Sequence, residues 1–504
     1  MLSIPHLSKS GSVEAKSKLC FLLTSSGKMR VKLRHLGSRS GLSQGNTSTE
    51  HLVPTKPPWN VSSTRLGMTG VGKRVERLFQ ALIYTSLTAS SASSLSSVLM
   101  ADSKIPGLPK WLEAAHNAAH ITVVLRTLQK RERTRIMARA ASKHQSHPSK
   151  RHRISHFAST VTTKAEYIKH YSIAAGSDPA YEHDNRYIDI VPYDRTRVVV
   201  CPGEPSHDCG SSCTSGRYLN ANWVRELAGG KWWIATQAPL PHTAHTFLSV
   251  ILEGISPPPA TTFSNISQLN RVRTIVQLTQ NLEGGARKAH IYFPPVEGQS
   301  WVIEPERGRE DPPIQVTLVR TQSIEEAHCV RSVVSLQLLS QDRTSTGDPV
   351  LFQHLLYASW PDHGVPARED RDGLLRFIRL VDEANRDLSL FTGMSDLDPN
   401  PPIMVNCSAG VGRTGAFIAI CSLLRHYRFL SPAVKPGEKV SPLPPSPLGP
   451  LPPEFEDDMV AQEVDSLREQ RPGMVQRDDQ VVLIYETLVA AFASAAGMDD
   501  DGSD

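Results

Sequence analysis

Apolar residues follow two different periods along this chain, and the change of period divides it. Between residues 109 and 141, apolar residues recur three or four positions apart, which is the spacing of one face of a helix. This pattern predicts one or two amphipathic helices. Beyond residue 155, short runs rich in β-branched residues alternate with turns and a few helices, which indicates a domain built around a β-sheet.

Individual elements are predicted within this second part. Two short apolar runs are typical of buried strands: residues 272–278 and 316–319. Alternation of apolar and polar residues over 330–339 and 351–358 predicts an antiparallel pair, with its turn at Thr-Gly-Asp 346–348. An apolar stripe at helical spacing predicts a helix over residues 373–385.

Segments without a period mark the boundaries of the predicted domains. Residues 143–153 form a basic linker, and residues 256–270 and 431–453 are Pro-containing insertions. The division that follows is a disordered leader, a helical lead-in with its linker, a main domain that contains the Pro-rich insertion, and an acidic tail: residues 1–99, 107–153, 154–496 and 497–504.

The net charge of +5 is distributed unevenly along the chain, which changes what it implies. Residues 1–99 contain 13 Lys and Arg against 3 Asp and Glu, a net charge of +10. The remaining residues therefore carry −5, so a nucleic-acid partner is not predicted. Two explanations of the basic, Ser-rich leader stay open: an organellar transit peptide, or an isoform or gene-model artefact upstream of a start at Met100.

The cysteines bear on compartment and on metal binding. Seven cysteines in 504 residues are too few for a disulfide framework, so we predict a reducing compartment, either cytoplasmic alone or nuclear as well. Cys201, Cys209 and Cys213 lie near His207, but their spacing matches no usual zinc site, and no metal is predicted. Residues 78–100 come closest to a membrane span, yet serines interrupt them, so no membrane partner is predicted.

One short segment carries the strongest chemical signal. Residues 403–405 form an apolar strand and residues 416–424 a largely apolar helix, with a loop of small residues between them. Such a loop at a helix N-terminus points successive N–H groups into one concavity and binds anions. The same positive potential lowers the pKa of a thiol placed there, so Cys407 is a candidate nucleophile. Arg413 returns to the rim, where its planar guanidinium can hold two phosphate oxygens.

This segment resembles the signature loop of the protein tyrosine phosphatase family, and further motifs follow in the family's order. They are the phosphotyrosine-recognition loop at 185–189 with 192–194, two structural motifs at 218–222 and 235–240, the mobile acid loop at 360–366, and the glutamine loop at 470–476 with Gln480. The resemblance spans residues 155–490 and implies the tyrosine-specific, non-receptor type. The fold that it implies is α/β, a single large domain with a twisted mixed sheet flanked by helices, in which the phosphate-binding loop joins a strand's C-terminus to a helix N-terminus.

The resemblance also assigns roles. In catalysis, Cys407 would attack the phosphorus, Arg413 would bind the phosphoryl oxygens, Asp362 would be the general acid, and Gln480 with Gln476 would orient water. The residues implied in substrate binding are Tyr187, Asp189, Ser408, Ala409, Gly410, Val411 and Gly412. The residues implied in support are Glu283, which would hold Arg413, together with Trp360 and Thr414. No cofactor is required, and the implied partners are phosphotyrosine-containing proteins.

Two residues depart from the family's usual pattern. Asn406 occupies the position before the nucleophile where His is common, and Asn cannot become cationic. Ile188 replaces a residue that is often charged, which leaves a preference for acidic substrates in doubt. The Pro-rich insertion is either an inert surface loop or a contact for an SH3-type domain or a kinase. A binding module without turnover, and a dual-specificity or lipid phosphatase, are the competing functions.

Overall fold

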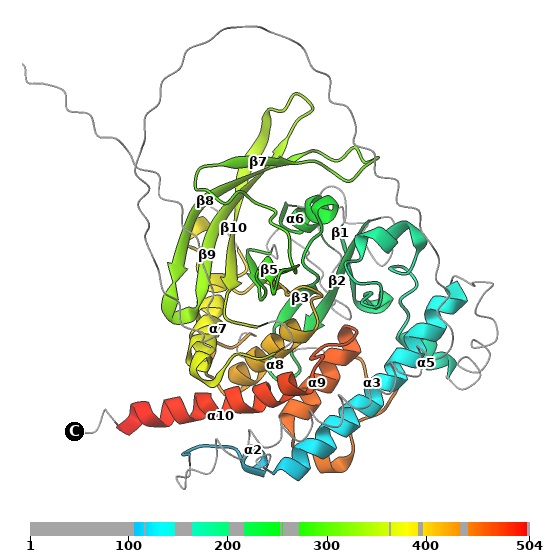
Figure 1. Cartoon of the computed structure of the whole chain (residues 1–504), viewed down its shortest axis with the longest axis vertical. Helices are drawn as coiled ribbons and strands as arrows, with labels where there is room; N and C mark the ends of the chain where they lie inside the picture. Colours follow the sequence, from blue (N-terminus) through cyan, green and yellow to red (C-terminus); the bar gives the residue numbers. More distant parts are fainter. Residues whose placement is uncertain are drawn as a thin grey trace, which may run out of the picture. The chain divides into compact units, whose positions relative to one another are not determined.

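A mixed sheet of nine strands runs through the protein, in the order β1-β2-β3-β11-β4-β10-β9-β8-β7 (Figure 1). The strands are β1 (Arg197–Val200), β2 (Arg217–Arg225), β3 (Trp232–Thr236), β4 (Thr274–Gln277), β7 (Ser300–Ile303), β8 (Ile314–Ile324), β9 (Cys329–Leu339), β10 (Ser345–Tyr357) and β11 (Ile403–Asn406). The computed structural model describes residues 105–114, 117–146, 164–200, 216–252, 255, 272–361, 364–391, 397–433 and 442–500, all of which fall in one compact unit, Gly70–Asp504.

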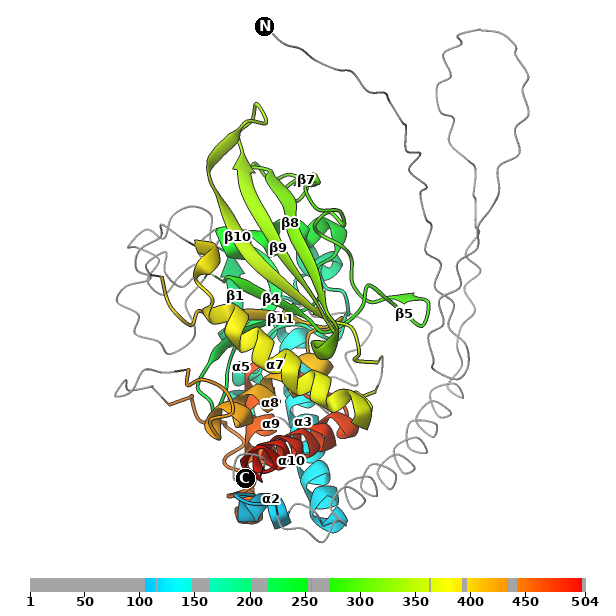
Figure 2. The ribbon, with the colours of Figure 1, turned by 90° about the vertical axis from the view of Figure 1, so that its left-hand side faces the viewer.

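Helices cover both faces of this sheet. They are α2 (Lys110–Ala114), α3 (Ala118–Ser146), α5 (Ala165–His170), α6 (Ala244–Leu252), α7 (Arg371–Arg386), α8 (Gly412–His426), α9 (Met459–Gln470) and α10 (Asp478–Asp500). Helix α6 packs into one hydrophobic cluster with one face of the strands (Figure 1). Helices α3 and α7–α10 share a second cluster with the other face (Figure 2). The fold predicted from the sequence, a mixed sheet between helices, is confirmed.

The centre of the sheet is parallel, and this determines where the predicted loop lies. Strand β11 pairs in parallel with β3 on one side and with β4 on the other, and β4 pairs in parallel with β10. All four residues of β11 are buried, as expected for a central parallel strand that is covered on both faces. The chain leaves β11 at the carboxyl edge, and α8 begins at Gly412, so the loop at residues 407–411 opens at that edge.

Most of the predicted elements are present, with one displaced turn. The predicted strands and the predicted helix correspond to β4, β8, β9, β10 and α7, and β9 pairs antiparallel with β10. The turn, however, is not at Thr-Gly-Asp. Thr346 already pairs with Leu338, and the chain reverses at residues 340–344, where Arg343 has a φ of 60°. A bulge between Thr346 and Val350 accommodates Gly347 within β10.

The predicted helical lead-in packs on the sheet-bearing core. It forms α2 and α3, and α3 continues past the predicted end at residue 141 to Ser146. Its buried side chains belong to the same hydrophobic cluster as α8, α9 and α10: Leu112, Ile121, Val124, Leu125 and Leu128. The assignment of residues 154–496 as a domain separate from this lead-in stays a prediction.

One described helix has the length and apolar composition of a membrane span, which the sequence analysis did not single out. It is α10, in the stretch Asp478–Gly497. This stretch is 67% buried inside the protein and packs against α8, as the core helix of a folded domain does. The leader, the 256–270 insertion, the three cysteines of the zinc hypothesis and residues 501–504 lie outside the described residues.

Candidate active site

The loop that follows β11 is folded tightly around the Cys407 thiol. The amide of Gly410 donates a hydrogen bond to Cys407 Sγ at 3.3 Å, and the amide of Ala238 donates to the Ser408 carbonyl at 3.0 Å. Gly410 has a φ of 70°, and a Cβ at this position would lie 1.9 Å from the carbonyl oxygen of Thr236. Only glycine fits there, because both the backbone conformation and the neighbouring strand exclude a side chain.

The electrostatics distinguish Cys407 from the other described cysteines. Burial alone raises a thiol pKa, and it raises that of Cys329 to about 12 and that of Cys421 well above its usual range. Cys407 is buried too, but the charge of Arg413, the Thr414 hydroxyl and the amides of the loop outweigh this burial and lower its pKa. A buried thiol with a lowered pKa is the mark of a reactive cysteine.

Arg413 is oriented by a bidentate ion pair. Its Nη1 donates to Glu283 Oε1 at 2.7 Å and its Nη2 donates to Oε2 at 2.6 Å, and Nη1 also donates to the Leu278 carbonyl at 3.0 Å. Glu283 is fixed in turn by the Thr279 hydroxyl and the Gln280 amide. Glu283 lies in the small hairpin β5 (Leu282–Glu283) and β6 (Ala286–Arg287), and bonds from Arg413 and Thr279 hold its pKa below the usual value despite burial. The structure therefore brings this predicted pair together.

Tyr187 lies against the same loop. Its hydroxyl is 2.8 Å from Ser408 Oγ, which itself donates to the Lys288 carbonyl at 2.7 Å. Because the Ser408 proton is used there, the Tyr187 hydroxyl is the donor of the pair. Asp189 and Ile188 are exposed beside it. The predicted recognition loop thus borders the mouth of the thiol-bearing loop.

The acid loop is closed by an internal hydrogen bond, and the glutamine loop flanks the start of α8. Trp360 is buried, and its indole N–H donates to the Gly364 carbonyl at 3.1 Å, so the two ends of the acid loop are tied together. Asp362 lies between these ends but outside the described residues, and its role stays a prediction. A Cβ on Gly412 would lie 3.0 Å from Gln480 Nε2 and 3.5 Å from Gln476 Cβ, so both glutamines flank the start of α8.

Sequence reasoning gave no role to Arg471, although this buried side chain supports the loop directly. Its Nε donates to the Gly410 carbonyl at 2.8 Å and its Nη2 to the Ala409 carbonyl at 3.1 Å. The same guanidinium also holds the side-chain oxygens of Asn220 and Asn222 on β2, at 3.0 and 2.9 Å. Arg471 lies inside the predicted glutamine motif, but nothing in the sequence distinguishes a buried arginine from an exposed one.

Asn406 is fully buried before the nucleophile, and it leads to a prediction on pH dependence. Its Nδ2 donates to the Cys407 carbonyl at 3.1 Å, while its Oδ1 meets no hydrogen-bond donor among the described residues. In Asn406→His, an imidazole that can carry a proton replaces the amide directly before Cys407. Because a cationic neighbour favours the thiolate, we expect the Cys407 pKa to fall.

The measurement is the pH dependence of iodoacetate inactivation. A lower thiol pKa leaves more thiolate at low pH, so the midpoint of inactivation should move to lower pH in Asn406→His. Asn385→His serves as control, because Asn385 is also buried but lies at the end of α7. Equal midpoints for the wild type and Asn406→His would show that Arg413 and the amides alone determine the acidity.

An acidic thiol in a glycine-rich loop between a parallel strand and a helix is the arrangement of cysteine-dependent enzymes that act on anionic groups. A family model described as protein-tyrosine phosphatase matches residues 181–435, just over half of the chain. The chain belongs to the protein-tyrosine phosphatase family.

Individual relatives agree with this assignment. Mouse tyrosine-protein phosphatase non-receptor type 18 is 30% identical over 337 residues, which cover 67% of this chain and 57% of the relative. Human non-receptor type 14 is 30% identical over 314 residues, covering 62% of this chain and 21% of the relative. Human non-receptor type 20 is 27% identical over 331 residues, covering 64% and 58%. The chain thus spans little more than half the length of non-receptor types 18 and 20, and about a fifth of the length of type 14.

Proposed function

We propose that this protein hydrolyses phosphotyrosine in other proteins. The observation that carries the proposal is the buried Cys407 thiol, whose pKa is lowered within a loop that Arg413 and Glu283 border. The position of Tyr187 at the mouth of this loop supports an aromatic phosphoester as substrate. Membership of the family supports the same reaction class.

The proposed reaction has two steps. The Cys407 thiolate attacks phosphorus, the bond from phosphorus to the tyrosyl oxygen breaks, and Asp362 gives its proton to that oxygen. A phosphocysteine intermediate and a free tyrosine result. Water, oriented by Gln480 and Gln476, then attacks phosphorus while Asp362 accepts its proton, and the S–P bond breaks to release inorganic phosphate and thiolate.

The loop lowers the barrier to both steps electrostatically. Charge on the three equatorial oxygens is neutralised by the loop amides and by the Arg413 guanidinium. Glu283 keeps that guanidinium in one orientation, so little reorganisation is needed when the phosphoryl group enters. No step requires a cofactor, and we predict none.

Asp362→Ala tests the general acid and the substrate class together. We expect kcat toward a phosphotyrosine peptide to fall about 10²- to 10⁴-fold, because the phenolate would leave unprotonated, while peptide binding persists. The measurement is turnover of phosphotyrosine and phosphothreonine peptides and of a phosphoinositide, side by side, by the wild type and the variant. Asp348→Ala is the control, since Asp348 is an exposed aspartate on β10.

Each alternative predicts a different outcome of this assay. Peptide binding without turnover by the wild type would identify a binding module, and equal turnover of the three substrates would identify a less selective phosphatase. The Asp362→Ala protein is also the reagent for capturing physiological substrates, because it should bind them and release them slowly.

The relatives and the described cysteines also bear on where the protein acts. Relatives of the non-receptor type support an intracellular protein, and the free thiols of Cys329, Cys407 and Cys421 fit a reducing compartment. The cytoplasmic assignment stays a prediction. The SH3-type partner and the kinase for the Pro-rich insertion also stay predictions, because only its sequence pattern supports them.

A further inference from the structure

The Glu469 carboxylate, in the last turn of α9, joins several distant parts of the chain. Its Oε1 accepts hydrogen bonds from Arg135 Nη2 at 2.7 Å, the Tyr171 hydroxyl at 2.7 Å and Ser446 Oγ at 2.9 Å. Its Oε2 lies 3.0 Å from His170 Nε2. Burial raises the pKa of a carboxyl, but bonds from His170 and Arg135 hold that of Glu469 far below its usual range. Glu469 is therefore ionised and fully engaged.

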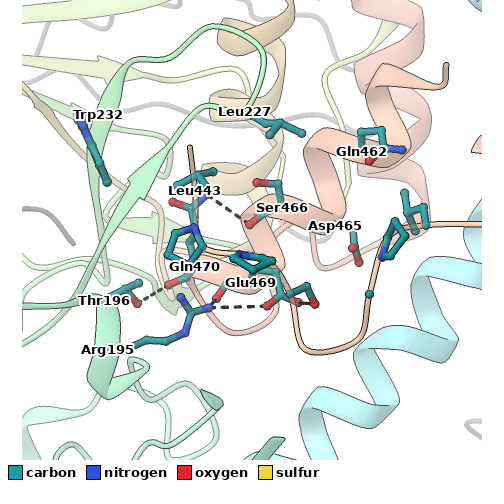
Figure 3. A pocket seen from close by; sticks show the side chains of 16 residues that line it. Arg195, Thr196, Leu227, Trp232, Leu443, Gln462, Asp465, Ser466, Glu469 and Gln470 are labelled. Carbon is teal, nitrogen blue, oxygen red and sulfur yellow. Dashed lines mark hydrogen bonds and ion pairs between the residues drawn. The ribbon is translucent and has the colours of Figure 1, made fainter. Parts of the chain in front are cut away.

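The Pro-rich segment 442–453 is one of the parts held here. Arg131 of α3 donates to the Gly449 carbonyl at 2.7 Å and lies 2.8 Å from Asp465 on α9. The segment crosses α9 above a cavity of about 350 Å³, with Leu443 and Glu469 on its walls (Figure 3). Ser446 thus faces inward while Pro444 and Pro445 are exposed.

The two residues that follow Glu469 contact different parts of the protein, β2 and the loop at residues 407–411. The Gln470 side chain bonds the backbone of Arg225 on β2, with its Oε1 accepting at 2.7 Å and its Nε2 donating at 2.9 Å. Arg471 donates hydrogen bonds to the Gly410 and Ala409 carbonyls of the loop at residues 407–411, called the phosphate loop below. The orientation of these two side chains depends on where the last turn of α9 ends.

We propose that Glu469 is a positioning residue for the phosphate loop, through which α3, Tyr171 and the Pro-rich segment hold Arg471 in place. The activity that this serves rests on the proposed function. When the anchors of Glu469 are removed, the last turn of α9 frays and Arg471 moves away from the loop carbonyls. The loop amides then converge less well, so the loop binds phosphate more weakly and the Cys407 pKa rises.

The test weakens the anchor without removing a charge. Tyr171→Phe combined with Ser446→Ala deletes two neutral donors to Glu469 and leaves the Arg135 ion pair intact. Tyr427→Phe combined with Ser340→Ala is the matched control, because neither hydroxyl bonds Glu469. The Tyr427 hydroxyl bonds Met459 and Trp111, and that of Ser340 bonds Thr344. Both proteins are the full chain. The probe is inorganic phosphate, measured by its protection of Cys407 against iodoacetate.

We expect the phosphate concentration for half-protection to rise about 3- to 10-fold in the anchor variant, and the inactivation midpoint to move to higher pH. Glu469→Gln should change both quantities further in the same direction. Unchanged protection in the anchor variant, with only its melting temperature lowered, would show a structural role alone and overturn the proposal. Protection requires phosphate binding only, so this result is independent of whether phosphotyrosine is hydrolysed.

Discussion

Cys407→Ser should abolish turnover of a phosphotyrosine peptide, by more than about 10⁴-fold, and still bind the peptide. The potential that stabilises a thiolate in this loop is too weak to ionise a serine hydroxyl, whose intrinsic acidity is far lower. The amides of the loop and the Arg413–Glu283 pair are unchanged by the substitution, so the phosphate cradle stays intact. Single-turnover hydrolysis and calorimetric titration with the same peptide measure the two effects separately.

Cys329→Ser is the matched control for this experiment. Cys329 is a second buried thiol, on β9, but its pKa is raised to about 12 because no cation outweighs its burial. Its replacement should leave turnover within a few-fold of the wild type. Turnover by Cys407→Ser at a rate close to that of the wild type would contradict a covalent mechanism. It would favour direct attack of water on phosphorus instead.

A chain that begins at residue 154 should fail to fold stably. Loss of α2 and α3 exposes the sites that receive five buried apolar side chains: Leu112, Ile121, Val124, Leu125 and Leu128. At about 1.5–3 kcal/mol for each, their loss is on the order of 10 kcal/mol, comparable with the whole free energy of unfolding of a domain. Asp465 and Glu469 would also lose Arg135, which pairs with both of them inside the protein. Urea denaturation of the shortened chain measures this loss.

A pair of adjacent valines on α3 provides a sharper version of the same test. Val124 is 0% exposed and Val123 is 43% exposed. We expect Val124→Asp to lower the free energy of unfolding by about 4 kcal/mol or more, and Val123→Asp to change it by less than about 1 kcal/mol. Equal effects of the two substitutions would mean that α3 does not pack on the core in solution.

The sequence predicted the loop and its two flanking elements because their signals are local. A short apolar run, small residues and a second apolar run follow one another within residues 403–424, and they form β11, the loop and α8. The displaced turn between β9 and β10 has a local cause as well. Thr-Gly-Asp has the composition of a turn, but a bulge also tolerates glycine, and only the pairing of Thr346 with Leu338 distinguishes the two.

The contacts that hold the site in place could not be predicted, because the residues that form them are far apart in the sequence. Arg135 meets Asp465 across 330 residues, and Arg471 meets Asn220 across 251. The period of apolar residues identified α3 as amphipathic but carried no information on which helix it would contact. The Pro-rich segment has no period at all, and its position follows from Arg131 and Ser446, two polar residues whose burial the sequence does not reveal.

The place of β11 in the sheet has a consequence for synthesis on the ribosome. Strand β11, residues 403–406, lies between β3 and β4, which leave the ribosome much earlier. Until it arrives, two neighbouring strand edges stay unpaired in the nascent chain, and contacts of such long sequence separation form slowly. Cys407 follows β11 directly, so the acidic thiol can form only after the middle of the sheet has closed. A nascent chain truncated before residue 403 would therefore expose these unpaired strand edges before it contained Cys407.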